Sequence, residues 1–237
     1  MNPEQYKTEL ENIDIKLTEQ QLNQFKIFYE DLIATNQQFN LTAITEKEDV
    51  YLKHYFDSLT VLPFFSSDKF SLVDVGAGAG FPSIPIKIAR PDISVTMVDS
   101  LGKRVDFLNK EINDLKLENI NAIHSRAEDF GQDSKYREQF DVAIGRAVAS
   151  IGILLEYLAP LIKIDGKVIL MKGDWQHTEE ELELAKNALE ILDCTVENFE
   201  KITLPNQDQR SILIIRKNSQ TINKYPRKAG TPNKLPL

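Results

Sequence analysis

Cysteine is nearly absent from this chain, and so are long apolar runs. Cys194 is the single cysteine among 237 residues, which excludes an internal disulfide and a zinc site built from several cysteines. Such usage fits a reducing compartment. The first residues, MNPEQYKTEL, show no basic segment followed by an apolar one, and no stretch reaches the about 18 apolar residues of a membrane span. We therefore expect a cytoplasmic protein without a membrane partner or a metal.

Basic residues are outnumbered by acidic ones, 28 lysine and arginine against 36 aspartate and glutamate, except near the carboxyl end. The formal net charge is −8 at pH 7, which disfavours a nucleic-acid partner because phosphate binding depends on lysine and arginine. Residues 216–237 nevertheless contain six basic and no acidic residues, so this segment carries +6 and the preceding 215 residues carry −14. The basic segment is either a solvated tail or an arm that contacts RNA.

Residues 1–64 have the pattern of a helical extension. Thr18 and Gln21 form a capping box, after which apolar residues recur every three or four positions. Thr45 and Glu48 repeat the capping pattern ahead of a second amphipathic stretch. We therefore expect amphipathic helices that pack one face against the rest of the chain.

Residues 65–217 alternate short apolar runs with helical segments. The runs typical of buried strands are 71–75, 93–98, 119–123, 140–144 and 167–171, with helical stretches at 84–89, 103–115 and 151–161. A helix capped by Thr178 and Glu181 follows and reaches Leu192, and the runs 195–204 and 211–216 then form a hairpin. This order predicts a doubly wound α/β sheet, mostly parallel with a terminal antiparallel hairpin, and 218–237 as a basic tail.

The first predicted strand leads into a glycine-rich loop that reads DVGAGAGFP from Asp74 to Pro82. Glycines allow positive φ and let a ligand approach the backbone without meeting a Cβ. A dinucleotide loop has the spacing G-x-G-x-x-G, and Phe81 stands where its third glycine would be. The spacing therefore disfavours a pyrophosphate and favours S-adenosylmethionine, which carries an ammonium, a carboxylate and a sulfonium but no phosphate.

Acidic residues stand at the ends of two predicted strands. Asp74 ends the first, where its carboxylate suits the cationic part of S-adenosylmethionine, and Asp99 ends the second, where it can accept hydrogen bonds from both ribose hydroxyls. Dinucleotide sites share an acid at the second position, so Asp99 does not choose between the cofactors. The stretch 125–129 follows the third strand and would flank the adenine. Together with Gly76 and Gly78, these residues make up the expected cofactor site.

Several further stretches of the chain carry a more specific pattern. They are 40–42 (NLT), 54–59 (HYFDSL), 74–82 (DVGAGAGFP), 99–104 (DSLGKR), 125–128 (SRAE), 145–150 (GRAVAS) and 225–232 (YPRKAGTP). With them, the chain resembles the bacterial 16S rRNA guanine-N7 methyltransferases, once called glucose-inhibited division protein B, over nearly its full length. A generic methyltransferase would share only the glycine loop and Asp99.

The resemblance implies a Rossmann-like class I S-adenosylmethionine-dependent methyltransferase with a helical N-terminal extension. It implies methyl transfer to N7 of guanine 527 in 16S rRNA of the small ribosomal subunit. On matching positions, it implies cofactor contacts at Gly76, Phe81, Ala127, Glu128 and Arg146. The tail departs from the family at Lys228, where arginine is frequent, and a lysine cannot make the bidentate phosphate contact of an arginine.

Guanine N7 carries a free lone pair, so methyl transfer to it needs no general base. The rate should come from alignment and from exclusion of water, and we assign no catalytic residue. Arg146 ends the fourth strand, where it can hold the rRNA backbone, the cofactor carboxylate or the guanine O6 edge, or form a salt bridge within the fold. The candidate RNA contacts are His54, Lys103, Arg104, Arg146, Arg227 and Lys228.

Two other functions fit the same residues. A small-molecule methyltransferase would use the N-terminal helices as a lid and leave the tail without a role. A non-catalytic nucleotide-binding or assembly factor would keep the pocket and transfer nothing. Mapping of methylation on rRNA separates these functions, and nothing in the sequence indicates an oligomeric state.

Overall fold

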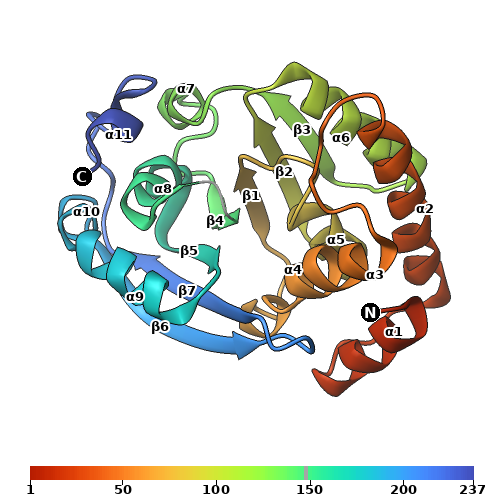
Figure 1. The fold of residues 1–237 in the computed structure, drawn as a ribbon. Coiled ribbons are helices and arrows are strands. Elements are labelled where there is room, and N and C mark those ends of the chain that lie inside the picture. The colour runs from red at the N-terminus through yellow and green to blue at the C-terminus, as the bar shows by residue number, and fades with distance from the viewer. Residues whose placement is uncertain (147–148) are drawn as a thin grey trace.

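A seven-stranded sheet forms the centre of the computed structural model, which describes residues 1–146 and 149–237 (Figure 1). The strands are β1 (Ser71–Val75), β2 (Ser94–Asp99), β3 (Ile120–His124), β4 (Phe140–Arg146), β5 (Ile162–Lys172), β6 (Cys194–Thr203) and β7 (Gln209–Lys217). Their order is β3-β2-β1-β4-β5-β7-β6. The first five run parallel, and β7 pairs antiparallel with β5 and β6. The predicted doubly wound sheet with a terminal hairpin is confirmed. Residues 147 and 148, which belong to the family-like stretch 145–150, lie outside the described residues.

Helices cover both faces of the sheet (Figure 1). One face carries α1 (Pro3–Asn12), α2 (Glu19–Asn36), α3 (Lys47–Asp49), the π-helical η1 (Val50–Phe56), α4 (Asp57–Leu59), the 3-10 turn η2 (Leu62–Phe64), α5 (Ser83–Ala89) and α6 (Gly102–Asp114). The other carries α7 (Ala127–Gln132), α8 (Ile151–Leu158), the 3-10 turn η3 (Ala159–Leu161), α9 (Trp175–Leu184), α10 (Lys186–Ile191) and α11 (Thr231–Lys234).

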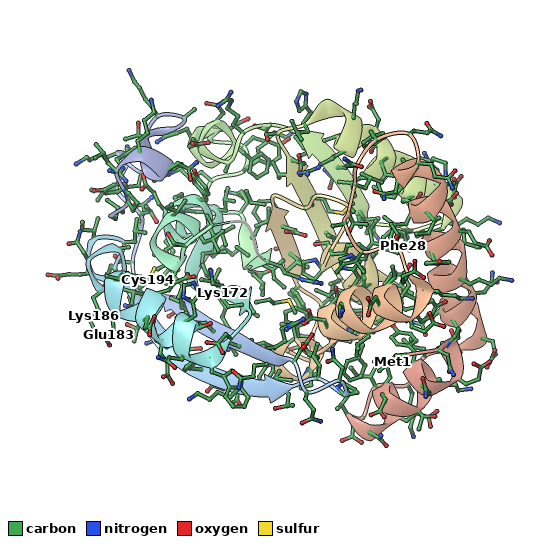
Figure 2. All side chains as sticks on the ribbon, in the orientation of Figure 1. Met1, Phe28, Lys172, Glu183, Lys186 and Cys194 are labelled. Atoms are coloured by element: carbon green, nitrogen blue, oxygen red, sulfur yellow. The ribbon has the colours of Figure 1, made fainter. Side chains whose placement is uncertain are left out.

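Alternating strand residues feed two hydrophobic cores, one on each side of the sheet. In β1, Leu72 belongs to the core under the N-terminal helices, and its neighbour Val73 belongs to the core under α8. This alternation follows from the period of two in a strand, and burial on both faces explains the nearly continuous apolar runs in the sequence. Side chains fill the space between the sheet and both helical layers (Figure 2).

The N-terminal extension shares its core with the sheet. The predicted capping box at Thr18 is present, with both reciprocal hydrogen bonds to Gln21. Behind it, buried aromatic rings gather against α5 and α6. They are Tyr6, Phe25, Phe28, Tyr51 and Tyr55, with ring centroids as close as 4.9 Å. Each such pair adds about 0.5–1.5 kcal/mol beyond the burial of apolar area. Because the aromatic residues are buried in the same core as β1, the extension is a fixed part of the fold.

Two predicted helix starts are wrong. Helix α3 begins at Lys47 without a side-chain cap, whereas the sequence pattern predicts Thr45 as its cap. Glu48 and Asp49 in its first turn instead favour its start through the helix dipole. In α9, Asp174 is the cap, since its carboxylate accepts from the amide of His177 at 2.8 Å. Thr178 therefore lies inside the first turn.

Other differences concern elements that the sequence did not reveal. The helix predicted to reach Leu192 is interrupted at Ala185 and so forms α9 and α10. Helices α1 and α7 had no individual prediction; α7 overlaps the stretch 125–129, which was expected only to flank an adenine. The basic tail, residues 218–237, packs on the domain, where Thr221 and Tyr225 are buried. Division of the chain at residues 64 and 217 stays a proposal.

Candidate active site

A pocket of about 350 Å³ opens at the carboxyl ends of β1, β2 and β3. Among the residues expected to bind a cofactor, Gly76, Asp99, Ala127 and Glu128 line it. The other lining residues are Val75, Val98, Ser100, Leu101, Ser125, Arg126, Tyr157, Gly230 and Asn233. Ligands of open α/β sheets bind outside the carboxyl ends of the strands, so the pocket lies at the edge where a cofactor is expected.

The glycine loop has a backbone that only glycine adopts without strain. Gly76, Gly78 and Gly80 have φ angles of 81°, 59° and 90°. A Cβ on Gly80 would lie 2.5 Å from Cδ1 of Ile84, so this glycine allows the loop to pack on α5. A Cβ on Gly78 would have the carbonyl oxygen of Gly76 as its nearest neighbour, at 3.9 Å. The space beside the Cα of Gly78 is therefore open, although Gly78 is not among the residues that line the pocket.

Asp99 holds the glycine loop and the start of α6 together. One carboxylate oxygen accepts from the amide of Gly78 at 2.9 Å, and the other accepts from the amide of Leu101 at 2.9 Å. The guanidinium of Arg104 lies 3.6 Å from the first of these oxygens. Each carboxylate oxygen has a second lone pair, so Asp99 retains the capacity to accept hydrogen bonds from ribose hydroxyls.

Asp74 lies beneath the loop and is not among the residues that line the pocket. Its carboxyl is buried and accepts a hydrogen bond from the Ser83 hydroxyl at 2.6 Å. Burial raises the pKa of Asp74 to about 7, against the opposing effect of the Ser83 hydrogen bond. Contact between Asp74 and the cationic part of a cofactor stays a prediction.

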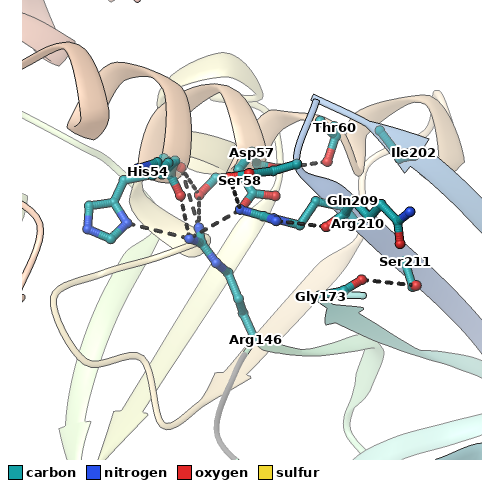
Figure 3. A network of polar contacts seen from close by, with 12 residues as sticks. His54, Asp57, Ser58, Thr60, Arg146, Gly173, Ile202, Gln209, Arg210 and Ser211 are labelled. Carbon is teal, nitrogen blue, oxygen red and sulfur yellow. Dashed lines mark hydrogen bonds and ion pairs between the residues drawn. The ribbon is translucent and has the colours of Figure 1, made fainter. Parts of the chain in front are cut away.

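Arg146 connects the end of β4 to the N-terminal extension (Figure 3). Its guanidinium donates to the Ser58 hydroxyl at 2.9 Å and to the Lys53 carbonyl at 2.6 Å, and it lies 3.4 Å from a carboxylate oxygen of Asp57. The salt bridge considered as an alternative for Arg146 is therefore present. It fixes the guanidinium at the carboxyl edge of the sheet, beside a second hollow described below.

His54 is a buried, neutral imidazole. Its Nε2 lies 2.9 Å from the Thr42 hydroxyl, its Nδ1 lies 3.4 Å from the guanidinium of Arg146, and its ring stacks on Phe81. Burial, and secondarily the charge of Arg146, lowers the pKa of His54 to about 3. The imidazole therefore carries no charge near neutral pH, and its visible role is to position its neighbours.

A second hollow of about 290 Å³ lies at the ends of β4 and β5 and the start of β7. In its wall, Asp57 bridges two guanidinium groups, because the same carboxylate oxygen is 2.9 Å from Arg210 and 3.4 Å from Arg146. Lys172 forms an ion pair of 2.8 Å with Glu181. The rest of the lining is Met171, Gly173 and His177. Lys172 was missed although it ends β5; the strand-end rule that pointed to Asp99 and Arg146 would have found it.

The other candidate RNA contacts differ in their surroundings. Lys103 is exposed at the start of α6, and Lys228 is exposed in the tail. Arg104 faces Asp99, as described above. Arg227 turns inward, with its guanidinium on the buried carboxylate of Glu156. Contacts of these residues with RNA stay a prediction.

Within residues 1–146 and 149–237, no group of three or more His, Cys, Asp and Glu side chains is placed to hold a metal ion. None of the helices in this part of the chain is both long and apolar enough to cross a membrane.

Solved structures with low sequence identity share the fold. The chain superposes on TYW2 from M. jannaschii in complex with AdoMet with a TM-score of 0.53, at 16% identity over 69% of this chain and 76% of that chain. TYW2 from P. horikoshii in complex with MeSAdo gives a TM-score of 0.54, at 16% identity over 69% of this chain and 62% of that chain. These likenesses support the class I S-adenosylmethionine-dependent methyltransferase fold.

Other proteins match the chain with much higher sequence identity than these solved structures. The family model described as rRNA small subunit methyltransferase G matches residues 21–213. "Ribosomal RNA small subunit methyltransferase G" of Leuconostoc mesenteroides is 50% identical over 240 residues, which cover 100% of both chains. The protein of the same name from Bacillus cereus is 49% identical over 239 residues, covering 100% of this chain and 99% of the other. This chain therefore belongs to the rRNA small subunit methyltransferase G family.

Proposed function

We propose that the chain transfers a methyl group from S-adenosylmethionine to N7 of guanine 527 in 16S rRNA. Full-length relatives named for ribosomal RNA small subunit methylation support the substrate. The observation that carries the proposal is the presence of two hollows along one edge of the sheet. One is lined by Gly76 at the start of the glycine loop and by Asp99, and the other by the charged side chains around Arg146. A cofactor and a target base need two such neighbouring sites. Ribosomal RNA as the substrate would also place the activity in the cytoplasm.

The first hollow fits S-adenosylmethionine. Gly76 lines this hollow with backbone that carries no Cβ, Asp99 offers acceptors for the ribose, and Ala127 and Glu128 stand where the adenosine would end. When bound, this cofactor supplies an electrophilic methyl group. Guanine N7 has a free lone pair, so the chain need not remove a proton. Its residues contribute by aligning the two sites and excluding water.

The second hollow fits the edges of a guanine that remain free when N7 reacts. Arg146, Arg210 and Lys172 can donate to O6, and the carboxylates of Asp57 and Glu181 can accept from N1–H and the exocyclic amine. Adenine presents a donor where guanine presents O6, so the cationic groups would disfavour it. Arg146 stands between this hollow and the glycine loop, since β4 lies next to β1.

Phosphate contacts are proposed for the exposed or partly exposed basic residues Lys103, Arg104 and Lys228. Arg227 remains a proposed RNA contact only through the part of its surface that Glu156 leaves uncovered. The small-molecule alternative requires the N-terminal helices to move as a lid. It is disfavoured because Phe25 and Phe28 of α2 are fully buried in the core between these helices and the sheet.

The test is methyl transfer in vitro. Purified chain and S-adenosylmethionine would be incubated with naked 16S rRNA and, separately, with small subunits, and the product nucleoside and its position would be mapped by mass spectrometry. We expect one N7-methylguanosine at position 527 in at least one substrate. Methylation elsewhere would contradict the target, and cofactor binding without transfer to either substrate would favour the small-molecule or assembly-factor alternative.

A further inference from the structure

The basic tail 218–237 is docked on α7 and α8. The guanidinium of Arg137 donates to the carbonyls of Thr221 at 2.7 Å and Tyr225 at 2.8 Å. Pro226 lies so close to Gly131 that a Cβ there would be 2.8 Å from the proline ring. Figure 1 shows α11 beside α8, in agreement with their contacts. The tail therefore occupies a defined position on the surface of the domain.

Arg227 clamps this segment to α8. Its Nε and one terminal nitrogen donate to the two carboxylate oxygens of Glu156, at 2.8 and 2.6 Å, and its backbone amide donates to the same carboxylate at 2.8 Å. The same guanidinium also donates to the Leu235 carbonyl at 2.8 Å. Glu156 is fully buried, so the bidentate pair satisfies a carboxylate that water cannot reach.

Beyond Arg227, the tail enters the pocket at the ends of β1 to β3. Gly230 and Asn233 are lining residues of that pocket. The amide of Gly230 donates to Glu128 at 2.8 Å, and the Asn233 side chain donates to the Tyr157 hydroxyl at 3.1 Å. Gly230 has a φ of 80°, which points its amide at Glu128 in a backbone conformation that other residues rarely adopt. Glu128 and Tyr157 line the pocket too, so the tail completes one wall.

We propose that residues 227–233 are part of the cofactor site, where they form the wall beside the adenosine of S-adenosylmethionine, and that Arg227 is the positioning residue that holds this wall. The proposal rests on the proposed function only in the identity of the cofactor. The opposite walls belong to the ends of β2 and β3, which in this type of sheet face the ribose and adenine. Docking of the tail and binding of the cofactor must then favour each other by the same factor.

Calorimetry with S-adenosylmethionine, on full-length variants whose folding is verified by circular dichroism, tests this wall. Arg227→Ala should raise the Kd about tenfold or more, because the binding-competent, docked state becomes a minor one. Arg227→Lys should lie between it and the wild type, since lysine keeps the charge but loses the bidentate geometry. Asn233→Ala, a milder change within the wall, should also raise the Kd. Lys234→Ala removes a neighbouring exposed charge and should leave the Kd unchanged.

Hydrogen exchange of the Gly230 amide gives a second measure without catalysis. S-adenosylmethionine should slow this exchange in the wild type, and much less in Arg227→Ala. The proposal would be overturned by wild-type affinity in both Arg227→Ala and Asn233→Ala, or by an exchange rate of the Gly230 amide that the cofactor does not change. Either result would leave the methyltransferase function intact. A wild-type chain that does not bind S-adenosylmethionine would instead overturn both.

Discussion

The imidazole of His54 stacks on the ring of Phe81, with ring centroids 4.3 Å apart and 12° between the ring planes. Phe81 follows the last glycine of the glycine loop, and His54 belongs to the π-helical segment of the N-terminal extension. The contact therefore joins the extension to the loop. π-Helical turns are frequent at functional sites, and here the turn carries the residue that supports the loop.

Replacement of His54 should weaken both the fold and the cofactor site. His54→Ala removes the stack and the imidazole partner of the Thr42 hydroxyl, which then keeps only the hydrogen bond from the Ile44 amide; we expect the free energy of unfolding to fall by about 1–3 kcal/mol. Urea unfolding measures this loss, and calorimetry should show weaker S-adenosylmethionine binding. His54→Phe keeps an aromatic ring and should retain more of the affinity than His54→Ala. Equal, wild-type affinity in both variants would mean that the stack does not position the loop.

Asp74 should make stability depend on pH. Burial raises its pKa from 3.8 to about 7, so the folded chain holds this proton more tightly than the unfolded chain. The resulting stabilisation is fully present below about pH 4 and is lost as pH rises towards 7, by at most about 4 kcal/mol.

Comparison with Asp74→Asn isolates this effect, because other buried groups such as Glu111 titrate in an overlapping range. Urea unfolding at several pH values should show the wild type losing stability relative to Asp74→Asn between pH 4 and 7. A constant difference across that range would show that Asp74 is already ionised in the fold at low pH.

Much of the sheet could be predicted because its strands are buried on both faces. The bounds of β1, for example, coincide with the apolar run 71–75. Helix starts were less predictable. The pattern of Thr45 and Glu48 matches a capping box, yet the helix begins at Lys47 and its first turn is favoured by acidic side chains alone. A four-residue pattern does not fix which residue takes the cap.

Within the site, strand ends could be predicted and long-range pairs could not. Asp99 and Arg146 follow from the rule that ligands gather at the carboxyl ends of strands. In contrast, the partners Asp57 and Arg210 are 153 positions apart in the sequence. No local periodicity or motif spacing brings such side chains together, since their meeting depends on the complete sheet order.

Gly78 and Gly80 should differ in what their replacement does to cofactor binding. Gly78→Val places a branched side chain in the open space above the loop at a φ of 59°, so we expect cofactor binding to be abolished and the unfolding temperature to fall, because valine is strained at positive φ. Gly80→Ala places a Cβ against Ile84 at a φ of 90° and should also lower the unfolding temperature, with a smaller effect on cofactor binding. Calorimetry and thermal unfolding of both variants measure the two effects. Retained cofactor affinity in Gly78→Val would contradict the proposed position of the ligand.

Lys228 should contribute to RNA affinity in a salt-dependent way. Because its side chain is exposed, Lys228→Ala should weaken binding to 16S rRNA and reduce the slope of log K against log salt by roughly 0.7–0.9 if one phosphate contact is lost. Filter binding at several salt concentrations measures the slope, with Lys163→Ala as a control at a lysine paired with Asp141. A slope equal to that of the wild type would remove Lys228 from the RNA interface.

Methylation of the natural substrate tests the proposed activity most directly. Ribosomal RNA from a strain that lacks this gene, and from the same strain carrying a wild-type copy, would be compared by mass spectrometry at guanine 527. We predict that N7-methylguanosine disappears at this position in the deletion strain and returns with the wild-type copy. Full methylation of guanine 527 in the deletion strain would contradict the proposal.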